Sequence, residues 1–321
     1  MAEAHSDSPS RVDYLRLSLT DRCNLRCTYC MPPEGVESLP HDQVLSYEEL
    51  AAFTRVAAGL GISKVRLTGG EPLVRKGVAD FVAMLATIPG ISDLSLTTNG
   101  LLLPRFAAPL RAAGLRRVNI SIDSLRPERY GRITRGGRLA DALAGLEAAF
   151  AVGFSPVKLN VVLQQGVEDE LDAFVALTRE REVHVRFIEY MPLDRRHVSG
   201  DGFVPAALVL ERLHAGHLLE PAAGPYGHGP ADYWRVHGVR GTLGFIAGVS
   251  EHFCGRCNRL RLTADGRLKT CLFSGEERDI RPLIDKPEEL AAALAVALQT
   301  KTYDRRAERV PNRRSMSQIG G

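Results

Sequence analysis

The sequence predicts an α/β protein: a partial, TIM-like (β/α)6 barrel, open at the side, that continues into a C-terminal cysteine-rich extension. Three observations lead to this prediction. Strand-like and helix-like segments alternate along residues 14–190, polar and glycine-rich motifs follow the strand-like segments, and the six cysteines form two groups of three. Strands that alternate with helices form a parallel sheet, and six such units are too few to close the usual eight-stranded barrel.

Six segments have the apolar composition and short length of strands. They are YLRLSLT (14–20), KVRLT (64–68), DLSLTTN (93–99), RRVNISID (116–123), VKLNVVL (157–163) and VHVRFIEY (183–190). Helical spacing of apolar residues fills most of the gaps between them, at 46–61, 78–87, 140–153 and 168–180. In the first of these helices, Ser46 is suited to be the N-cap, and Gly61 is suited to end the helix.

The composition is that of a globular protein without a membrane span. Hydrophobic residues make up 45% of the chain and the mean hydropathy is −0.09, as is typical of globular proteins. The N-terminus has neither the basic start nor the apolar stretch of a signal peptide. The most apolar window, ELAAALAVAL at 289–298, is about half of the ~20 residues that span a membrane. We therefore expect a cytoplasmic protein with no membrane partner.

The charge is unevenly distributed along the chain. The formal net charge is +3, yet residues 301–321 alone hold six lysines and arginines against two acidic residues. A basic end of this kind is ordinarily a solvated, disordered tail. We expect a disordered N-terminal extension at 1–10, a barrel at 11–200, a C-terminal domain at 201–300 and the basic tail at 301–321.

The first cysteine group, Cys23, Cys27 and Cys30, lies in DRCNLRCTYC directly after the first strand. Three thiols match neither a disulfide nor the four protein ligands of a structural zinc site. A 4Fe–4S cluster bound by three cysteines leaves one iron open for an outside ligand, which accounts for the number three. The alternatives are a zinc site completed by a histidine such as His41 and an electron-transfer ferredoxin. The ferredoxin does not account for the polar loops after the other strands.

Those loops carry further polar motifs. They are TGGEP (68–72), TTNG (97–100), SIDS (121–124) and EYM (189–191), and Lys158 and Asn160 lie inside the fifth strand. In parallel α/β proteins the loops at the carboxyl ends of the strands build the active site, so these motifs and the first cysteine group are expected to surround one cavity. The two glycines of TGGEP let backbone groups approach a ligand, although this motif is also an ordinary turn.

The second cysteine group is Cys254, Cys257 and Cys271, within FCGRCNRLRLTADGRLKTCLF at 253–273. Two alternating stretches flank the turn sequence Ala-Asp-Gly at 264–266, which predicts a β-hairpin. The hairpin would bring Cys271 back toward the other two cysteines. Two compact groups of this kind indicate two metal sites rather than a disulfide framework.

The hairpin also carries Arg259 and Arg261, which alternate with leucines and so share one face of the strand. Arginines at this spacing can hold phosphate or carboxylate oxygens bidentately, and a salt-bridged strand face is the alternative. The stretch at 221–238 is loop-rich and holds the only tryptophan, Trp234, but no chemistry can be assigned to it. The histidines follow no catalytic spacing and are expected to be surface or packing residues.

These motifs resemble known enzymes. The Cys-x3-Cys-x2-Cys spacing after the first strand of a βα series is similar to that of the radical S-adenosylmethionine superfamily. Within it, the chain resembles the GTP 3′,8-cyclase family of molybdenum cofactor biosynthesis from about Arg11 to Gly321, only loosely at 200–245. The matching motifs are DRCNLRCTYCMP, KVRLTGGEPL, LTTNG, SIDSL, RITRGG, RFIEYM, the second cysteine group with its NRLRLTADG, and the terminal SMSQIGG.

The resemblance implies a lyase that cyclises GTP. In the family, S-adenosylmethionine on the open iron of the first cluster is cleaved to a 5′-deoxyadenosyl radical, which abstracts hydrogen from ribose C3′ of GTP. The C3′ radical then adds to guanine C8. The implied cofactors are S-adenosylmethionine and two 4Fe–4S clusters, held by Cys23, Cys27 and Cys30 and by Cys254, Cys257 and Cys271. The open iron of the second cluster would be free to bind the guanine edge.

The resemblance also implies residue roles. The S-adenosylmethionine site would be lined by Tyr29, Gly70, Ser121 and Met191. The GTP site would be lined by Arg16, Arg66, Thr97, Lys158, Arg259, Leu260 and Arg261. Thr97 and Ser121 also fit the role of loop caps, and Met191 that of core packing.

The terminal Gly320 and Gly321 are expected to enter the catalytic pocket. The family resemblance points there, and glycines pass where any Cβ would clash. The alternative is the disorder that is usual for chain ends.

The implied partners are GTP, a reductant such as flavodoxin or ferredoxin, cyclic pyranopterin monophosphate synthase as the next enzyme, and a second copy in a homodimer. No nucleic-acid partner is expected. Two other functions remain open: a radical S-adenosylmethionine peptide maturase with an auxiliary cluster, and a zinc-stabilised nucleic-acid-binding protein that uses the basic tail. The compact basic hairpin favours a nucleotide substrate over a peptide.

Overall fold

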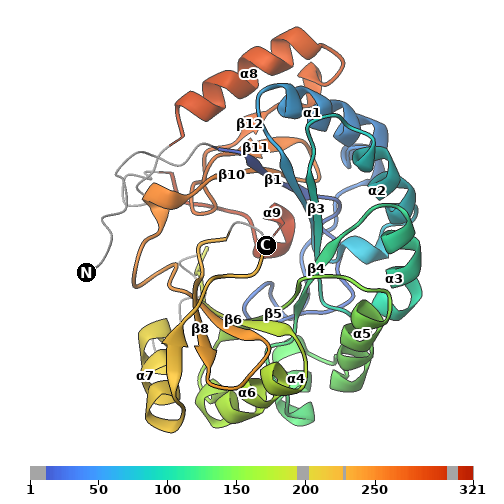
Figure 1. Ribbon diagram of the computed structural model, residues 1–321. Helices are drawn as coiled ribbons and strands as arrows, with labels where there is room; N and C mark the ends of the chain where they lie inside the picture. The colour runs from blue at the N-terminus through green and yellow to red at the C-terminus, as the bar shows by residue number, and fades with distance from the viewer. Residues whose placement is uncertain (1–11, 194–201, 227–228, 302–309, 321) are drawn as a thin grey trace.

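The computed structural model describes residues 12–193, 202–226, 229–301 and 310–320. Its strands form an incomplete ring with most helices on the outer side, and the last short helix lies near the centre of the ring (Figure 1). This confirms the expected partial barrel that is open at the side. The segment expected to be a disordered extension lies outside the described residues, and the expected domain boundaries stay a prediction.

Six parallel strands build most of the ring, and each coincides with an expected strand. They are β1 (Tyr14–Ser18), β2 (Lys64–Thr68), β3 (Asp93–Thr98), β4 (Arg117–Ser121), β5 (Val157–Leu163) and β6 (Val183–Glu189). Each strand pairs in parallel with the next in sequence. All six carboxyl ends therefore lie at one edge of the sheet, where the loops that follow them meet.

The C-terminal part of the chain extends this sheet at both edges. Beyond β1 lie β10 (Arg259–Leu262), β11 (Arg267–Lys269) and β12 (Arg278–Asp279), and beyond β6 lie β9 (Thr242–Ile246), β8 (Asp232–Val236) and β7 (Leu219–Pro221). β10 runs parallel to β1, and β10 and β11 form the expected hairpin, with Gly266 at φ +81° in its turn. β12 and β7 are the two ends of the sheet, so the ring stays open.

Helices cover the outer face of the ring. They are α1 (Tyr47–Gly59), α2 (Val78–Ala86), α3 (Leu103–Ala112), α4 (Pro127–Thr134), α5 (Leu139–Ala151), α6 (Leu171–Glu180), α7 (Ala206–Gly216) and α8 (Pro287–Gln299), with α9 (Met316–Ile319) inside it. Ser46 is the N-cap of α1, because its side chain accepts from the Glu49 N–H at 3.1 Å. Gly61, at φ +100°, follows the end of the same helix as expected.

The stretch at 221–238 is less loop-like than the sequence suggested. β8 runs through it and pairs antiparallel with β9. Trp234 of β8 packs edge-to-face on His214 of α7, with 5.0 Å between the ring centroids. The tryptophan is thus a packing residue. Its strand was missed because short strands near the edge of a sheet depend on the neighbours they pair with more than on their own sequence.

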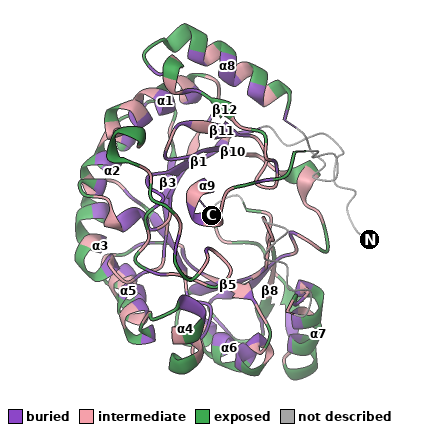
Figure 2. Cartoon of the chain, turned by 180° about the vertical axis from the view of Figure 1, so that it is seen from behind, coloured by how far each residue is buried: buried purple, intermediate pink, exposed green. Residues whose placement is uncertain are grey.

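The core lies between the strands and the outer helices, where Figure 2 shows the buried faces. Leu15 and Leu17 of β1 are fully buried there, whereas Arg16 between them points the other way, toward the interior of the ring. Side chains alternate across a strand, so the ring interior is free to carry polar and charged residues. Within the part of the chain that the structure describes, no helix is long and apolar enough to cross a membrane.

Candidate functional site

A cavity of about 300 Å³ occupies the interior of the ring at the carboxyl ends of the strands. Both cysteine groups line it, together with residues of the loops after β1, β2, β3, β4 and β6 and of the β10–β11 hairpin. The convergence that the sequence predicted is therefore present, and it includes the second group as well as the first. His41, which would have completed a zinc site, does not line this cavity.

The first cysteine group is held by the end of α4. The N–H groups of Arg26 and Thr28 donate to the carbonyls of Thr134 and Ile133 at 3.2 and 2.9 Å. Arg135 donates to the carbonyls of Arg26 and Met31 at 3.0 and 2.8 Å, and its own backbone has φ +52°. That left-handed backbone conformation is unusual for a residue other than glycine. The RITRGG motif therefore supports the cysteine loop through these hydrogen bonds.

The thiols of this group sit in surroundings that disfavour negative charge. Burial raises the pKa of Cys23, and burial together with the Asp123 carboxylate raises that of Cys27 well above its usual value. Burial raises the pKa of Cys30 to about 12, although a hydrogen bond from the Ser317 N–H opposes the shift. The thiols are therefore protonated until a metal replaces the protons, as metal binding generally requires.

These thiols suit a cluster better than a single ion. Each is a free cysteine, partly buried, on the wall of one cavity. Among the described residues, no three His, Cys, Asp or Glu side chains converge closely enough to hold one metal ion. A 4Fe–4S cube binds each cysteine to a different iron, so its thiols need not converge on one point.

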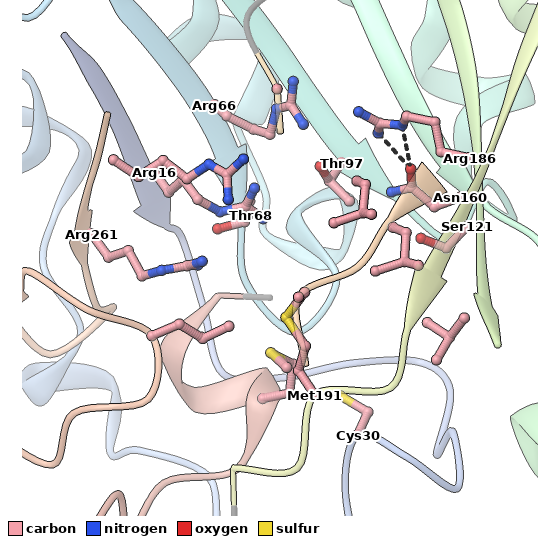
Figure 3. Close-up of a pocket in the computed structure, with 18 of the residues that line it drawn as sticks. Arg16, Cys30, Arg66, Thr68, Thr97, Ser121, Asn160, Arg186, Met191 and Arg261 are labelled. Atoms are coloured by element: carbon pink, nitrogen blue, oxygen red, sulfur yellow. Dashed lines mark hydrogen bonds between the residues drawn. The ribbon is translucent and has the colours of Figure 1, made fainter. Parts of the chain in front are cut away.

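The four residues expected around S-adenosylmethionine all line the cavity: Tyr29, Gly70, Ser121 and Met191. The Tyr29 hydroxyl donates to Asp123 at 2.9 Å, and burial raises the pKa of that carboxyl to about 6. A Cβ on Gly70 would stand 2.3 Å from the Arg22 carbonyl oxygen, so only glycine fits there. Figure 3 shows Met191 close to Cys30, and both line a second small pocket.

Glu71 of the TGGEP motif joins two of the loops. Its carboxylate accepts hydrogen bonds from the Leu73 N–H, the Thr98 hydroxyl and the Asn99 N–H at 3.0, 2.8 and 2.7 Å. Burial raises its pKa to about 7, and these three hydrogen bonds act against that shift. The residue was not singled out from the sequence, yet it fixes the loops after β2 and β3 beside the first cysteine group.

The second cysteine group has a different setting. Burial by itself would raise the pKa of Cys257, but the charges of Lys301 and Arg259 lower it overall. Lys301 is buried, and its ammonium donates to the Thr270 carbonyl at 2.5 Å, next to Cys271 in the chain. The second group thus lies at a cationic end of the cavity.

Cations from several strands line that end. They are Arg16, Arg66, Lys158, Arg186, Arg259, Arg261 and Lys301. The Asn160 side-chain oxygen accepts from Arg186 at 3.0 and 2.5 Å, as the dashed lines in Figure 3 mark. Asn119, with its amide oxygen turned toward the arginines, accepts from both Arg66 and Arg186. Neutral amides therefore space the guanidinium groups without neutralising them.

Lys158 is a strongly desolvated member of this set of cations. It is 2% exposed, and its ammonium donates to the Tyr226 carbonyl at 3.0 Å. Burial lowers its pKa to about 6, with Arg186, Arg117 and Arg66 adding to the shift. Such a lysine gains most when an anion enters the cavity.

Of the remaining residues expected around GTP, Thr97 lines the cavity, whereas the Leu260 side chain is fully buried in the hydrophobic core. Arg186 and Lys301 were missed as site residues. Arg186 could have been found, because within VHVRFIE it alternates with apolar residues on β6 just as Arg16 does on β1. Lys301 has no such pattern around it.

The C-terminus reaches the same region. α9 lies near the centre of the ring, and Gly320 is buried, with φ +86°. Its carbonyl accepts from Arg261 at 3.1 Å, and a Cβ on it would stand 2.5 Å from the Thr68 hydroxyl. Glycine is therefore required at this position. Gly321 lies outside the described residues.

Comparisons with known proteins agree along most of the chain. Residues 17–177 match the family described as "Radical SAM superfamily", and residues 183–308 match that described as "Molybdenum Cofactor Synthesis C". The chain is 52% identical to the GTP 3′,8-cyclase of Pelotomaculum thermopropionicum, covering 97% of this chain and 98% of that protein. It is 50% identical to that of Moorella thermoacetica, with the same coverage.

Solved structures support the fold. The crystal structure of Streptococcus suis SuiB bound to S-adenosylmethionine aligns with a TM-score of 0.60 at 14% identity, over 86% of this chain and 65% of that one. The curated relatives are cyclases rather than peptide maturases or zinc-stabilised nucleic-acid-binding proteins, so both alternatives from the sequence fall away.

Proposed function

Because this chain belongs to the GTP 3′,8-cyclase family of radical S-adenosylmethionine enzymes, which acts in molybdenum cofactor biosynthesis, we propose that GTP and S-adenosylmethionine meet between its two cysteine groups. One observation carries the proposal: a single cavity is lined by both groups, with carboxylates near one and cations around the other. The bond formed would join ribose C3′ to guanine C8.

At the first end, a radical S-adenosylmethionine domain carries a 4Fe–4S cluster, and Cys23, Cys27 and Cys30 are its proposed ligands. When bound, that cluster and S-adenosylmethionine supply one-electron radical chemistry. The protein's part is to hold and enclose the cofactor. Gly70 allows backbone groups to come close, and Ser121 and Met191 lie on the cavity wall beside it. Tyr29 is fixed by Asp123, so the wall is ordered before the ligand arrives.

At the other end, a triphosphate would find several fixed cations. Arg16 and Arg261 are paired across β1 and β10, and Arg66 follows Arg16 on the next strand. Fixed guanidinium groups bind phosphate oxygens bidentately, and the strands keep them in place without a reorganisation cost. Arg259 and Lys158 complete the set, Thr97 lies on the same wall, and Leu260 would take part through its backbone only.

The second cysteine group is proposed to hold a second 4Fe–4S cluster. Three thiols on one cavity wall, with cations that lower the pKa of Cys257, fit such a group. With three protein ligands, one iron would face the substrate and could take the guanine edge. Gly320 and Gly321 are proposed to complete the pocket beside Arg261, which holds the Gly320 carbonyl.

The proposed partners follow from the reaction. The radical chemistry consumes an electron, so a low-potential carrier such as flavodoxin or ferredoxin would supply it. The cyclised nucleotide would pass to cyclic pyranopterin monophosphate synthase. We also propose a homodimer and a cytoplasmic location, on the family resemblance alone.

The test is anaerobic reconstitution with iron and sulfide, followed by S-adenosylmethionine, a reductant and GTP. We expect 5′-deoxyadenosine and a cyclised guanosine nucleotide in matched amounts. The control is the variant in which Cys254, Cys257 and Cys271 are alanine, which keeps the first group but should yield no cyclised product. Cleavage of S-adenosylmethionine by the parent protein without any nucleotide product would contradict the proposal.

A further inference from the structure

The C-terminal segment is fastened to the second half of the protein by Arg314. Its guanidinium donates to Asp265 at 3.2 and 2.8 Å and to Glu277 at 2.9 Å, so one side chain bridges two carboxylates. The Arg314 side chain is 20% exposed, and those of Asp265 and Glu277 are 15% and 18% exposed. Within the described residues 310–320, Arg314 makes two ion pairs, one with Asp265 and one with Glu277.

The two carboxylates are themselves held in place. Asp265 lies in the β10–β11 turn and accepts from the Thr263 hydroxyl at 2.6 Å. Glu277 accepts from Lys269 of β11 at 3.0 Å, and that lysine is fully buried. The hairpin that fixes Arg314 is also the element that carries Arg259, Arg261 and Cys271 into the cavity. The position of the tail is thereby fixed relative to the end of the cavity that carries the second cysteine group.

Residues ahead of Arg314 follow the same surface. The Gly275 N–H donates to the Val310 carbonyl at 2.8 Å, and Ser274 and Pro311 form an isolated antiparallel bridge. A Cβ on Gly275 would stand 2.2 Å from the Pro311 carbonyl oxygen, so the two segments are in close contact. The Asn312 side chain, which is buried, donates to the Arg314 carbonyl at 3.1 Å.

Beyond Arg314 the chain turns into the cavity at once. Ser315 caps α9 in a reciprocal pair with Gln318, and Met316 lines the cavity. The Ser317 N–H donates to the Cys30 thiol of the first group, and the Gly320 carbonyl accepts from Arg261. One helical turn therefore contacts both ends of the site, and Arg314 stands immediately before it.

We propose that Arg314, which bridges Asp265 and Glu277, is a positioning residue that sets where Gly320 lies in the catalytic cavity. This inference rests on the proposed function for its catalytic consequence. Arg314 lines the second small pocket but not the main cavity, so it acts through the tail and not on the substrate. A bidentate contact fixes direction as well as distance, which a lysine at this position would not do.

The first test measures position rather than activity. Hydrogen exchange of the peptide covering 315–320 is followed in the reconstituted protein for Arg314→Gln and for Arg313→Gln as the matched control. Arg313 is the exposed neighbour, so its variant removes the same charge from the same segment. Charge-assisted hydrogen bonds of this kind typically lower the equilibrium constant for local opening by a factor of about 10–100. Exchange in Arg314→Gln should therefore be faster by about tenfold or more. The Arg313 variant should exchange like the parent.

The second test is the coupling of the reaction. In Arg314→Gln we expect both clusters to assemble, GTP to bind with nearly the parent affinity, and the ratio of cyclised nucleotide to 5′-deoxyadenosine to fall about tenfold. Arg314→Lys should lie between the variant and the parent.

Parent-like exchange at 315–320 in Arg314→Gln would overturn the proposal, as would equal effects of the Arg313 and Arg314 variants. Iron content guards against misfolding, and Arg314→Lys provides a milder variant if Arg314→Gln does not fold. The exchange experiment needs no nucleotide. If Arg314→Gln frees the tail but the parent makes no cyclised nucleotide, the positioning role stands and the proposed function fails.

Discussion

The two cysteine groups offer the same number of thiols to the same cavity in opposite electrostatic surroundings. Around the first, burial and the carboxylate of Asp123 push the pKa of the thiols up. Around the second, Lys301 and Arg259 pull the pKa of Cys257 down in spite of burial. Thiol count and burial are matched, so the difference comes from the neighbouring charges.

That difference indicates what each group is built to receive. S-adenosylmethionine carries a sulfonium cation, which suits a site with buried carboxylates such as Asp123 and Glu71. A nucleoside triphosphate is strongly anionic and suits a site with arginines and lysines on five strands. On the proposed function, one cavity would bind the two ligands in regions of opposite charge and bring them together between the two cysteine groups.

The supports of the two groups differ as well. The first lies on a loop whose backbone is bonded to the end of α4, with Arg135 as the clamp. The second lies on a hairpin that is hydrogen-bonded into the main sheet through β10 and β1. The tail that carries Gly320 contacts both, through Cys30 on one side and Arg261 on the other.

The largest expected effect separates the two groups by metal content. Replacing Cys23, Cys27 and Cys30 by alanine should lower the iron content from about eight to about four per chain and abolish S-adenosylmethionine cleavage. The same change at Cys254, Cys257 and Cys271 should also halve the iron but leave cleavage measurable. Iron analysis and 5′-deoxyadenosine assay check both. Cleavage that survives the first triple change would show that the roles are assigned wrongly.

Removing the element that contacts both groups should come next. Deletion of Gly320 and Gly321 should abolish the cyclised nucleotide, because the carbonyl held by Arg261 and the pocket wall beside Thr68 are lost. Both clusters and GTP binding should survive, and 5′-deoxyadenosine should form without product. Appending one residue to the C-terminus should abolish product formation as well, which separates the fit of the chain end from its length. A normal rate of product formation after the deletion would reduce the tail to a passive end.

A smaller effect should come from the cations of the second end. Arg259→Ala or Arg261→Ala should weaken GTP binding by about ten- to a hundredfold, since losing one charge-assisted hydrogen bond costs about 1.5–3 kcal/mol. S-adenosylmethionine binding should not change, and lysine at either position should restore little. Calorimetry with both ligands decides the matter. If GTP affinity is unchanged in both variants, these arginines are structural.

The smallest effect is a pH dependence. The pKa of Lys158 in the free protein is lowered to about 6, so above that pH its amine is mostly neutral. A bound triphosphate favours the ammonium and raises the pKa, so GTP binding should take up a proton at neutral pH. As the pH rises, the affinity for GTP should fall by up to about tenfold per pH unit over the range in which the Lys158 amine is neutral in the free protein and charged in the complex.

Calorimetry in buffers of different ionisation enthalpy measures this proton uptake directly. Lys158→Arg keeps its charge at all these pH values, so its GTP affinity should depend less on pH. Proton uptake of the same size in the parent and in Lys158→Arg would exclude Lys158 as its source.

Much of the barrel could be predicted from sequence because its information is local. The parallel strands appear in the sequence as short stretches in which apolar residues alternate with polar ones, and the turn at 264–266 is marked by its Asp-Gly. The cysteine spacing likewise lies within a few residues. Cys254 and Cys257 could be placed near Cys271, because the hairpin that joins them is short.

What was missed depends on partners far away in the chain. β7 is an edge strand and β8 is the strand next to it, and their pairing with each other and with β9 makes them strands, whereas the sequence at 221–238 shows mainly turn residues. Arg314 meets Asp265 and Glu277 only through the folded hairpin, so nothing beside it in the sequence marks it out. Arg186 is the exception, because its alternation was readable and was overlooked.

The most direct test of the account is a cross-titration of the two triple-cysteine variants with both ligands. By calorimetry, the variant without Cys23, Cys27 and Cys30 should lose S-adenosylmethionine binding and keep GTP affinity to within about twofold, as expected of independent sites. The variant without Cys254, Cys257 and Cys271 should show the reverse, with GTP binding strongly weakened. If either variant loses both ligands together, or if GTP binds equally well to both, the division of the cavity by charge is wrong.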